Sequence, residues 1–99
     1  MGLLKFDFEK ANVQIQELAE ISAEIDKVAS VEFEEVMQQL RQAWKGSAAD
    51  AYMKKASKVQ KKIKKAATDV QKTSESYIRA VKRVQAAEEK AKEIVGKRN

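Results

Sequence analysis

The sequence predicts an all-α fold in which two long helices pack side by side as an antiparallel hairpin. The chain has 99 residues, no proline and three glycines, of which only Gly46 lies far from both ends. Because proline and glycine interrupt helices most strongly, one interior break leaves two long segments. Apolar side chains recur at steps of three and four residues in both segments, which is the spacing of one helical face. We therefore expect a single domain over residues 1–99 with one central turn.

The first helix is expected over residues 5–43. Its apolar row is Phe8, Ala11, Ile15, Leu18, Ser22, Ile25, Ala29, Phe33, Val36, Leu40 and Ala43. Two successive steps of four around Ala29 and Phe33 form a stutter in the heptad pattern, which we expect to straighten the supercoil there. A second apolar row flanks the first and consists of Val13, Ile21, Val28, Val31 and Met37. This helix is therefore apolar over a wider arc than one neighbour can cover.

The turn is expected at residues 44–47, where the only tryptophan of the chain is followed two positions later by glycine. Gly46 can adopt the left-handed conformation that closes a helix, and Trp44 can cover the end of the hairpin. Ser47 is a suitable N-cap for the next helix, and Asp50 supplies a carboxylate to its first turn.

The second helix is expected over residues 48–95. Its apolar row alternates steps of four and three: Tyr52, Ala56, Val59, Ile63, Ala66, Val70, Thr73, Tyr77, Ala80, Val84, Ala87, Ala91 and Ile94. This heptad spacing predicts packing against a partner helix with a left-handed supercoil. Many positions in the row are alanine, so the two helices are expected to approach closely and to bury little area per residue.

The predicted hairpin leaves the flanking row of the first helix in water. An exposed apolar strip of that length indicates a partner. The simplest cover is a second hairpin, which gives a four-helix bundle. We therefore predict a homodimer or a heterodimer with a related helical chain, and the flanking row defined above is the expected interface.

The two halves of the chain carry opposite charge. Residues 1–43 hold four basic and nine acidic side chains, a net charge of −5, whereas residues 44–99 hold 16 and six, a net charge of +10. In the hairpin, residues whose numbers sum to about 90 face each other, which places Lys64 near Glu24 and Asp26. Exposed pairs of this kind contribute about 0.2–1 kcal/mol each, and they favour this pairing over like-charged alternatives.

The sequence gives little support for a catalytic, metal-binding or cofactor-binding site. Cysteine and histidine are absent, so no metal or other cofactor is expected. Glu32 and Glu35 lie one helical turn apart beside Glu34, but without a pocket they are expected to form a solvated acidic face. Enzymatic activity is not expected. The N-terminus lacks the apolar stretch of a cleavable signal peptide, and no segment is long enough for a membrane span.

The chain length, the two helices and the Trp44-Lys45-Gly46 turn resemble the WXG family of small bacterial proteins, the ESAT-like proteins of type VII secretion systems. The resemblance covers nearly the whole chain. It implies a protein made in the bacterial cytoplasm and secreted without a cleavable signal peptide, as a substrate or as the partner of a substrate. In that family the Trp-x-Gly turn is half of an export signal that the membrane-bound motor ATPase recognises. The resemblance assigns this role to Trp44 and Gly46.

The other half of that signal in the family is Tyr-x-x-x-Asp/Glu. Tyr77 is followed four residues later by Val81, and Tyr52 by Ala56, so neither tyrosine carries the acid. This favours pairing with another helical chain that supplies the signal, such as the helical N-terminal region of a larger secreted effector.

Two alternatives stay open. One is a basic helical protein that binds nucleic acid through the lysine row of the second helix, Lys54, Lys58, Lys61 and Lys65. That row lacks interleaved aromatic residues, which argues against binding of single strands. The other alternative is a coiled-coil adaptor unrelated to secretion.

Overall fold

The computed structural model describes residues 6–98, and these are almost entirely helical. The elements are α1 (Phe8–Lys27), a π-helical turn η1 (Val28–Glu32), α2 (Phe33–Ala43) and α3 (Ser47–Arg98). No strand occurs among these residues, so the all-helical class predicted from the sequence is confirmed for them. The helices α1, η1 and α2 follow one another without a break, and we call them together the first arm. The molecule is a rod of 80 × 17 × 17 Å.

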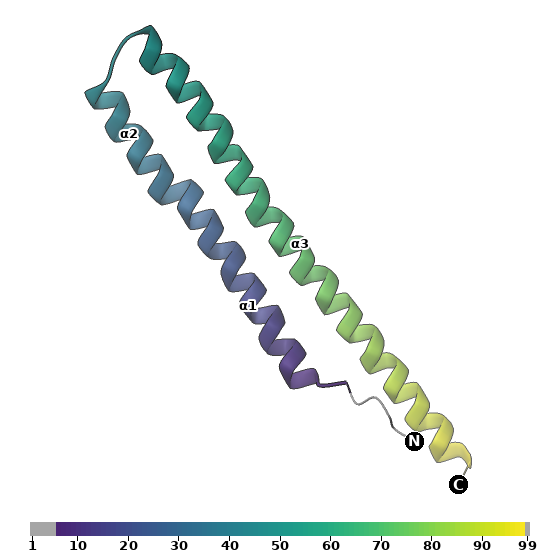
Figure 1. The fold of residues 1–99 in the computed structure, drawn as a ribbon. Coiled ribbons are helices and arrows are strands. Elements are labelled where there is room, and N and C mark those ends of the chain that lie inside the picture. The colour runs from purple at the N-terminus through teal and green to yellow at the C-terminus, as the bar shows by residue number, and fades with distance from the viewer. Residues whose placement is uncertain (1–5, 99) are drawn as a thin grey trace.

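The first arm lies beside α3 and runs in the opposite direction (Figure 1). Three side chains bridge the two by donating hydrogen bonds to backbone carbonyls. These bonds join Ser22 Oγ to Ala67 at 2.8 Å, Gln60 Nε2 to Ala29 at 2.8 Å and Ser74 Oγ to Ile15 at 3.3 Å. The two residue numbers of each bond sum to 89, which agrees with the register expected from a central turn. The arrangement is coiled-coil-like, with both helices in contact over most of the first arm.

An aspartate fixes the start of α1. Asp7 has an extended backbone conformation, and its side chain accepts a hydrogen bond from the Lys10 backbone N–H at 2.9 Å. This bond satisfies one of the amide donors that a helix leaves free in its first turn. The helix therefore begins at Phe8, whereas the predicted start at residue 5 lies outside the described residues.

The predicted stutter of the first arm coincides with a turn of π-helix. In η1 the Phe33 N–H donates to the carbonyl of Val28, five residues earlier. An α-helix makes this bond to the fourth residue, so the π-turn holds one extra residue. Successive steps of four, through Ala29, Phe33 and Met37, therefore all stay on the side that faces α3. A local change in helix type, rather than a straightened supercoil alone, accommodates the break in the heptad pattern.

Small side chains line the seam between the first arm and α3. The buried residues of the described chain are Ala11, Ser22, Ala29, Met37, Ala49, Ala67, Ser74 and Val81. Six of these eight are alanine or serine, so the two backbones approach closely while few methylene groups leave water. The serine hydroxyls are not left without partners, because each donates to a carbonyl of the opposite arm.

The row of α3 that faces the first arm differs from the predicted row at every second position. Both rows contain the half-buried Ala56, Ile63, Val70, Tyr77 and Val84. The structure combines them with Ala49, Met53, Gln60, Ala67, Ser74 and Val81, whereas the prediction combined them with Tyr52, Val59, Ala66, Thr73, Ala80 and Ala87. The prediction was wrong there because hydrophobicity alone excludes Gln60 and Ser74. Their hydrogen bonds to carbonyls make them suitable for the seam.

A second correction concerns the end of the first arm. The prediction placed Val36 in the seam and Met37 in the outer interface, and the structure reverses the two. Met37 is 2% exposed and lies between the arms, whereas Val36 is 54% exposed. The extra residue of the π-turn rotates every later residue of the arm by one position, which brings Met37 inward. Met37 is therefore no part of an outer interface.

The turn consists of Trp44, Lys45 and Gly46. Trp44 ends α2 in an extended conformation, and its N–H donates to the Leu40 carbonyl at 2.8 Å. Gly46 has φ +116°, a conformation that favours glycine, as expected for this position. Its carbonyl accepts the first helical hydrogen bond of α3, from the Asp50 N–H at 3.0 Å. The prediction of Ser47 as N-cap was therefore one residue too late: Ser47 is already helical.

The expected ion pairs across the seam do not form. Within the described residues the ion pair shorter than 4.0 Å joins Arg41 to Glu34 at 3.7 Å, inside α2. Lys64 makes no such contact with Glu24 or Asp26. The register is as predicted, but small seam residues hold it, and the lysines of α3 from Lys54 to Lys92 are exposed.

We predict that Gly46→Ala lowers the free energy of unfolding. A Cβ at this position meets open space, so only the positive φ opposes it, at about 1 kcal/mol or slightly more. The thermal midpoint, measured by circular dichroism, should fall by roughly 4–8 °C. Gly96→Ala is the matched control, because Gly96 is helical and also faces open space. An equal loss in both variants would contradict the assigned role of the backbone conformation.

Candidate protein-interaction face

Large apolar side chains of both arms are exposed on one side of the rod. From the first arm they are Ile21, Val28 and Val36, exposed at 46%, 42% and 54%. From α3 they are Tyr52, Val59 and Ile94, exposed at 51%, 47% and 49%. The α3 residues belong to a row with strict seven-residue spacing, completed by the exposed Ala66, Thr73, Ala80 and Ala87. We call the surface formed by these two rows the open face.

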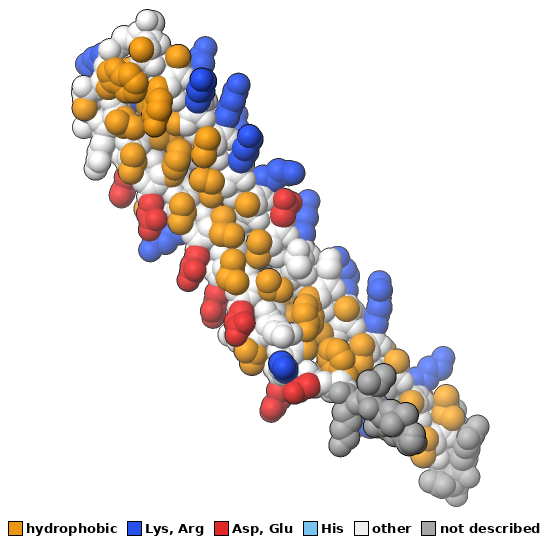
Figure 2. Space-filling model, in the orientation of Figure 1, with side chains coloured by type: hydrophobic (Ala, Val, Ile, Leu, Met, Phe, Trp, Pro, Cys, Tyr) orange, Lys and Arg blue, Asp and Glu red, His pale blue; other side chains and the backbone are white. Residues whose placement is uncertain are grey.

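The open face runs along the whole rod. Figure 2 shows an apolar stripe that follows the junction of the two arms from the turn to the opposite end. Acidic side chains border the stripe along the first arm, and basic side chains border it along α3 (Figure 2). Because both arms contribute, this surface is wider than the strip predicted on the first helix alone. A contiguous exposed apolar surface of this length makes the open face the candidate interaction surface of the rod.

The structure places the five predicted interface residues in three different settings. Ile21 and Val28 lie on the open face. Met37 is buried in the seam. Val13 and Val31 are exposed, at 52% and 45%, but they stand to the side of the row that carries Ile21 and Val28. Seven-residue steps from Ile21 lead to position 14, not 13, and Val31 lies within the π-turn.

Sequence reasoning missed half of the open face. It assigned Tyr52, Val59 and Ile94 to the seam, and it assigned Val36 to the seam in place of Met37. The seven-residue spacing of the α3 row was visible in the sequence, but it fits a seam and an outer row equally well. The seam row is distinguished from the outer row by two polar residues, Gln60 and Ser74, which donate hydrogen bonds across the seam.

Two aromatic rings mark the turn end of the open face. Trp44 and Tyr52 pack with their ring centroids 5.5 Å apart and an angle of 51° between the planes. Trp44 is 42% exposed, so it covers the end of the arms while remaining accessible. Tilted aromatic pairs at this distance are favourable, so Tyr52 holds the indole in place against α3.

At the other end of the open face lies an apolar groove of about 430 Å³. Its walls include Phe6, which precedes α1, and Tyr77, Ala80 and Val84 of α3. Tyr77 also donates a hydrogen bond of 2.6 Å from its hydroxyl to Gln14 Oε1 of α1. The groove continues the apolar surface to the N-terminal end of the first arm.

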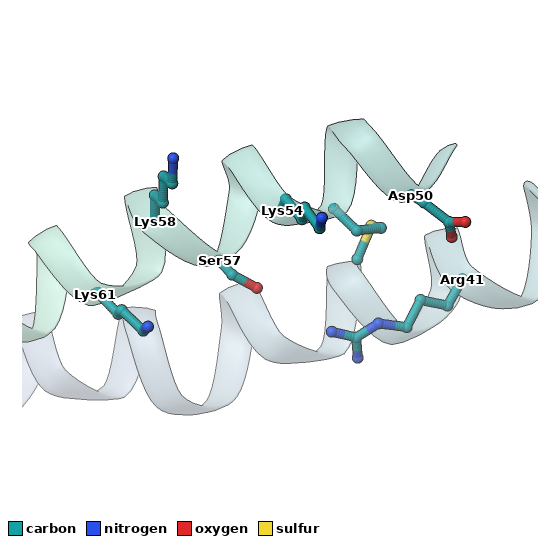
Figure 3. Close-up of a pocket in the computed structure, with 7 residues that line it drawn as sticks. Arg41, Asp50, Lys54, Ser57, Lys58 and Lys61 are labelled. Atoms are coloured by element: carbon teal, nitrogen blue, oxygen red, sulfur yellow. The ribbon is translucent and has the colours of Figure 1, made fainter. Parts of the chain in front are cut away.

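The opposite side of the rod is polar. A groove of about 680 Å³ near the turn is lined by Arg41, Asp50, Met53, Lys54, Ser57, Lys58 and Lys61. In Figure 3, Ser57 and Lys61 point toward the neighbouring arm, and Lys58 points away from it. The groove is open and no charged side chain in it is buried, which gives it no means of excluding water from a reaction. We regard it as a solvated surface.

A small polar network ties α2 to α3 on this side. Gln60 Nε2 donates to Glu34 Oε2 at 2.9 Å as well as to the carbonyl of Ala29. Glu34 also pairs with Arg41. The hydrogen bond from Gln60, followed by the charge of Arg41, lowers the pKa of Glu34 below its ordinary value of 4.5. The network therefore links the π-turn to the register of the two arms.

Comparisons of the chain with protein-family models, curated proteins and solved structures give no match. Within the described residues, no three acidic side chains lie close enough together to hold a metal ion. None of the described helices is long and apolar enough to cross a membrane. The open face and the adjoining turn are therefore the features of the molecule that a proposed function has to explain.

We predict that Gln60→Leu raises the pKa of Glu34 toward its ordinary value. Glu34 with a lowered pKa stabilises the fold above pH 4.5, and this stabilisation is lost as the pH falls through the pKa of the folded state. The substitution should therefore flatten the loss of thermal stability between neutral and acidic pH. Carboxyl NMR titration of Glu34 measures the pKa directly. Gln71→Leu, at an exposed position of α3, is the control, and an unchanged Glu34 titration in Gln60→Leu would refute the assignment.

Proposed function

We propose that this chain is a small helical hairpin that pairs with a second helical hairpin through its open face, as a substrate or secretion partner of a bacterial type VII system. The observation that carries the proposal is the open face itself. Full burial of a large apolar side chain contributes about 1.5–3 kcal/mol, and the six on this surface still expose 42–54% of their area, so a partner could add about half of that for each. The pair of hairpins would form a four-helix bundle.

The narrow seam supports the same proposal. Most of the fully buried side chains between the arms are alanine or serine. Larger seam residues such as Ile15, Leu18 and Ile63 are only half-buried, and further large apolar groups are exposed on the open face, so a partner would add burial that the seam alone does not provide. We infer that the second hairpin supplies the core that this chain lacks when alone.

The turn supports the secretory part of the proposal. Trp44 is partly exposed and is held by Tyr52 at the tip of the rod, where another protein can reach it. The Trp-x-Gly turn resembles the export signal of the WXG family, and the motor ATPase of the secretion system would recognise it. Because the sequence lacks the Tyr-x-x-x-Asp/Glu half of that signal, the partner hairpin would provide it.

Charged residues on the open face should separate the proposed complex. We expect Ile21→Glu with Val28→Glu to weaken assembly at least tenfold, because both side chains lose the burial that the partner adds and two charges enter an apolar interface. Sedimentation equilibrium of the complex purified from the native host measures its mass. Val13→Glu is the control, because Val13 is equally exposed but stands beside the row. If the double variant kept its partner, the assignment of the open face as the interface would be wrong.

Replacement of the exposed tryptophan should block export while the fold persists. In a host with a type VII system, wild-type chain or its partner should reach the culture medium only when the motor ATPase is present. Trp44→Ala should abolish export and leave helicity by circular dichroism nearly unchanged, whereas Lys45→Ala in the same turn should preserve export. Export that does not depend on the motor ATPase, or that persists in Trp44→Ala, would contradict the secretory role. The chain would then be better described as a coiled-coil adaptor unrelated to secretion.

A further inference from the structure

A straight row of cations runs along the outer side of α3. Lys58, Lys65, Lys72 and Arg79 recur with seven-residue spacing, and all four are exposed. Each of the three lysines is followed two positions later by a seam residue, the first of which is Gln60. Two residues correspond to about 200° around a helix, so this central row faces away from the first arm. Figure 3 shows Lys58 in that orientation.

Two further pairs of lysines flank the turn half of the central row. Lys54 and Lys61 lie on one side of it, and Lys55 and Lys62 lie on the other. We call the resulting surface the basic ridge, and its six exposed residues are Lys54, Lys55, Lys58, Lys61, Lys62 and Lys65. At a rise of 1.5 Å per residue the ridge is about 17 Å long, and it covers three adjacent rows of the helix.

The charge of the basic ridge is not paired within the described residues. Between Asp50 and Asp69, the chain carries seven lysines and no acidic residue. No lysine of the ridge forms an ion pair shorter than 4.0 Å with a residue of the described range 6–98. The acidic side chains of the first arm border the other side of the apolar stripe (Figure 2). The ridge therefore presents a concentrated positive potential to an anionic partner.

We propose that the basic ridge binds double-stranded DNA through its phosphates. B-DNA carries one negative charge per about 1.7 Å of its axis, and each lysine that contacts a phosphate releases condensed counterions. Its major groove is about 12 Å wide and admits an α-helix. The outer side of α3 would lie in the mouth of this groove, and the first arm would stay outside it.

The three rows of the ridge match the two edges of such a groove. Lys54 and Lys61 would reach the phosphates of one strand, and Lys55 and Lys62 would reach those of the other. The central row would lie between the strands, where every base pair presents acceptor atoms. Because most of these contacts are made to phosphates, they position the chain on the duplex without reading its sequence.

The composition and shape of the ridge favour duplex DNA over other anionic partners. A flat layer of lipid headgroups would meet mainly the central row, whereas a groove meets all three rows. The ridge consists of lysine alone, so it has no large apolar side chain to insert into a bilayer and no aromatic side chain to stack on single-stranded bases. Lysine is depleted in protein interfaces, and the major groove of duplex RNA is too narrow for a helix.

This inference goes beyond the proposed function and does not depend on it. No residue of the ridge belongs to the open face, so a chain that is paired through the open face keeps the ridge accessible. Loss of DNA binding would leave pairing and export untouched, and failure of the open-face variants would leave the ridge untouched.

The test is the affinity of the full chain for a fluorescently labelled DNA duplex of about 20 base pairs, measured by anisotropy over a range of salt concentrations. With six phosphate contacts, the logarithm of the association constant should fall with the logarithm of the salt concentration with a slope of about −5. Two duplexes of unrelated sequence should bind equally. The single strand of either duplex should bind more weakly, because it has no groove.

A pair of matched variants locates the binding surface. Lys58→Gln with Lys65→Gln should raise the dissociation constant at least about tenfold near 0.1 M salt and reduce the slope by about two. Lys10→Gln with Lys27→Gln is the control, because it removes the same charge from exposed positions of the first arm. All four substitutions replace exposed helical residues, so helicity by circular dichroism should be unchanged in both variants.

Each outcome decides the proposal. Binding that is lost in the ridge variant and retained in the control supports it. An equal loss in both variants, or none in the ridge variant, overturns the ridge as the binding surface. Absence of duplex binding at tens of micromolar chain in low salt overturns DNA as the partner, as does a single strand that binds as tightly. Vesicles of phosphatidylglycerol and phosphatidylcholine, compared at equal phosphate concentration, overturn it in favour of a membrane surface if they bind the chain more tightly than the duplex does.

Discussion

The narrow seam between the arms is the constraint on which the rest of the structure depends. Alanine and serine at most of its buried positions let the two backbones approach closely, and serine and glutamine side chains bond to carbonyls across it. Those bonds fix the register at residue numbers that sum to 89. A seam of this kind specifies how the arms align, but it leaves the larger hydrophobic groups half-buried at its edges or exposed on the open face.

Those groups lie together because the two arms share one geometry. Seven-residue spacing on α3 and a π-turn in the first arm keep each apolar row on the same side of the rod along its whole length. The opposite side is left polar, with Gln60, Glu34 and Arg41 as its link between helices. The molecule thus has one polar face and one apolar face, with the Trp44–Tyr52 pair at the turn end of the apolar face.

Sequence periodicity predicted the helices, the turn at Gly46, the register and the site of the stutter. Each of these follows from local spacing or from the absence of proline, and needs no knowledge of what lies opposite. The choice of seam on α3 was not predictable in this way, because Gln60 and Ser74 look unsuitable until their carbonyl partners are known. The exchange of Met37 with Val36 had a similar cause, since a heptad break can be absorbed by a π-turn or by a change of supercoil. The outer surface was therefore predicted on one arm only, with Ile21 and Val28 placed correctly.

The central claim is that the open face of this chain is covered by another helical hairpin. Its most direct test is the dependence of the thermal midpoint of the complex, purified from the native host, on protein concentration, because unfolding coupled to dissociation shifts the midpoint by mass action. We expect the midpoint to rise steadily over a hundredfold range of concentration, and to become independent of concentration in the variant with Ile21→Glu and Val28→Glu. A midpoint of the unmodified chain that stays constant across that range would show that the rod is stable alone with its apolar face in water, and would contradict the account.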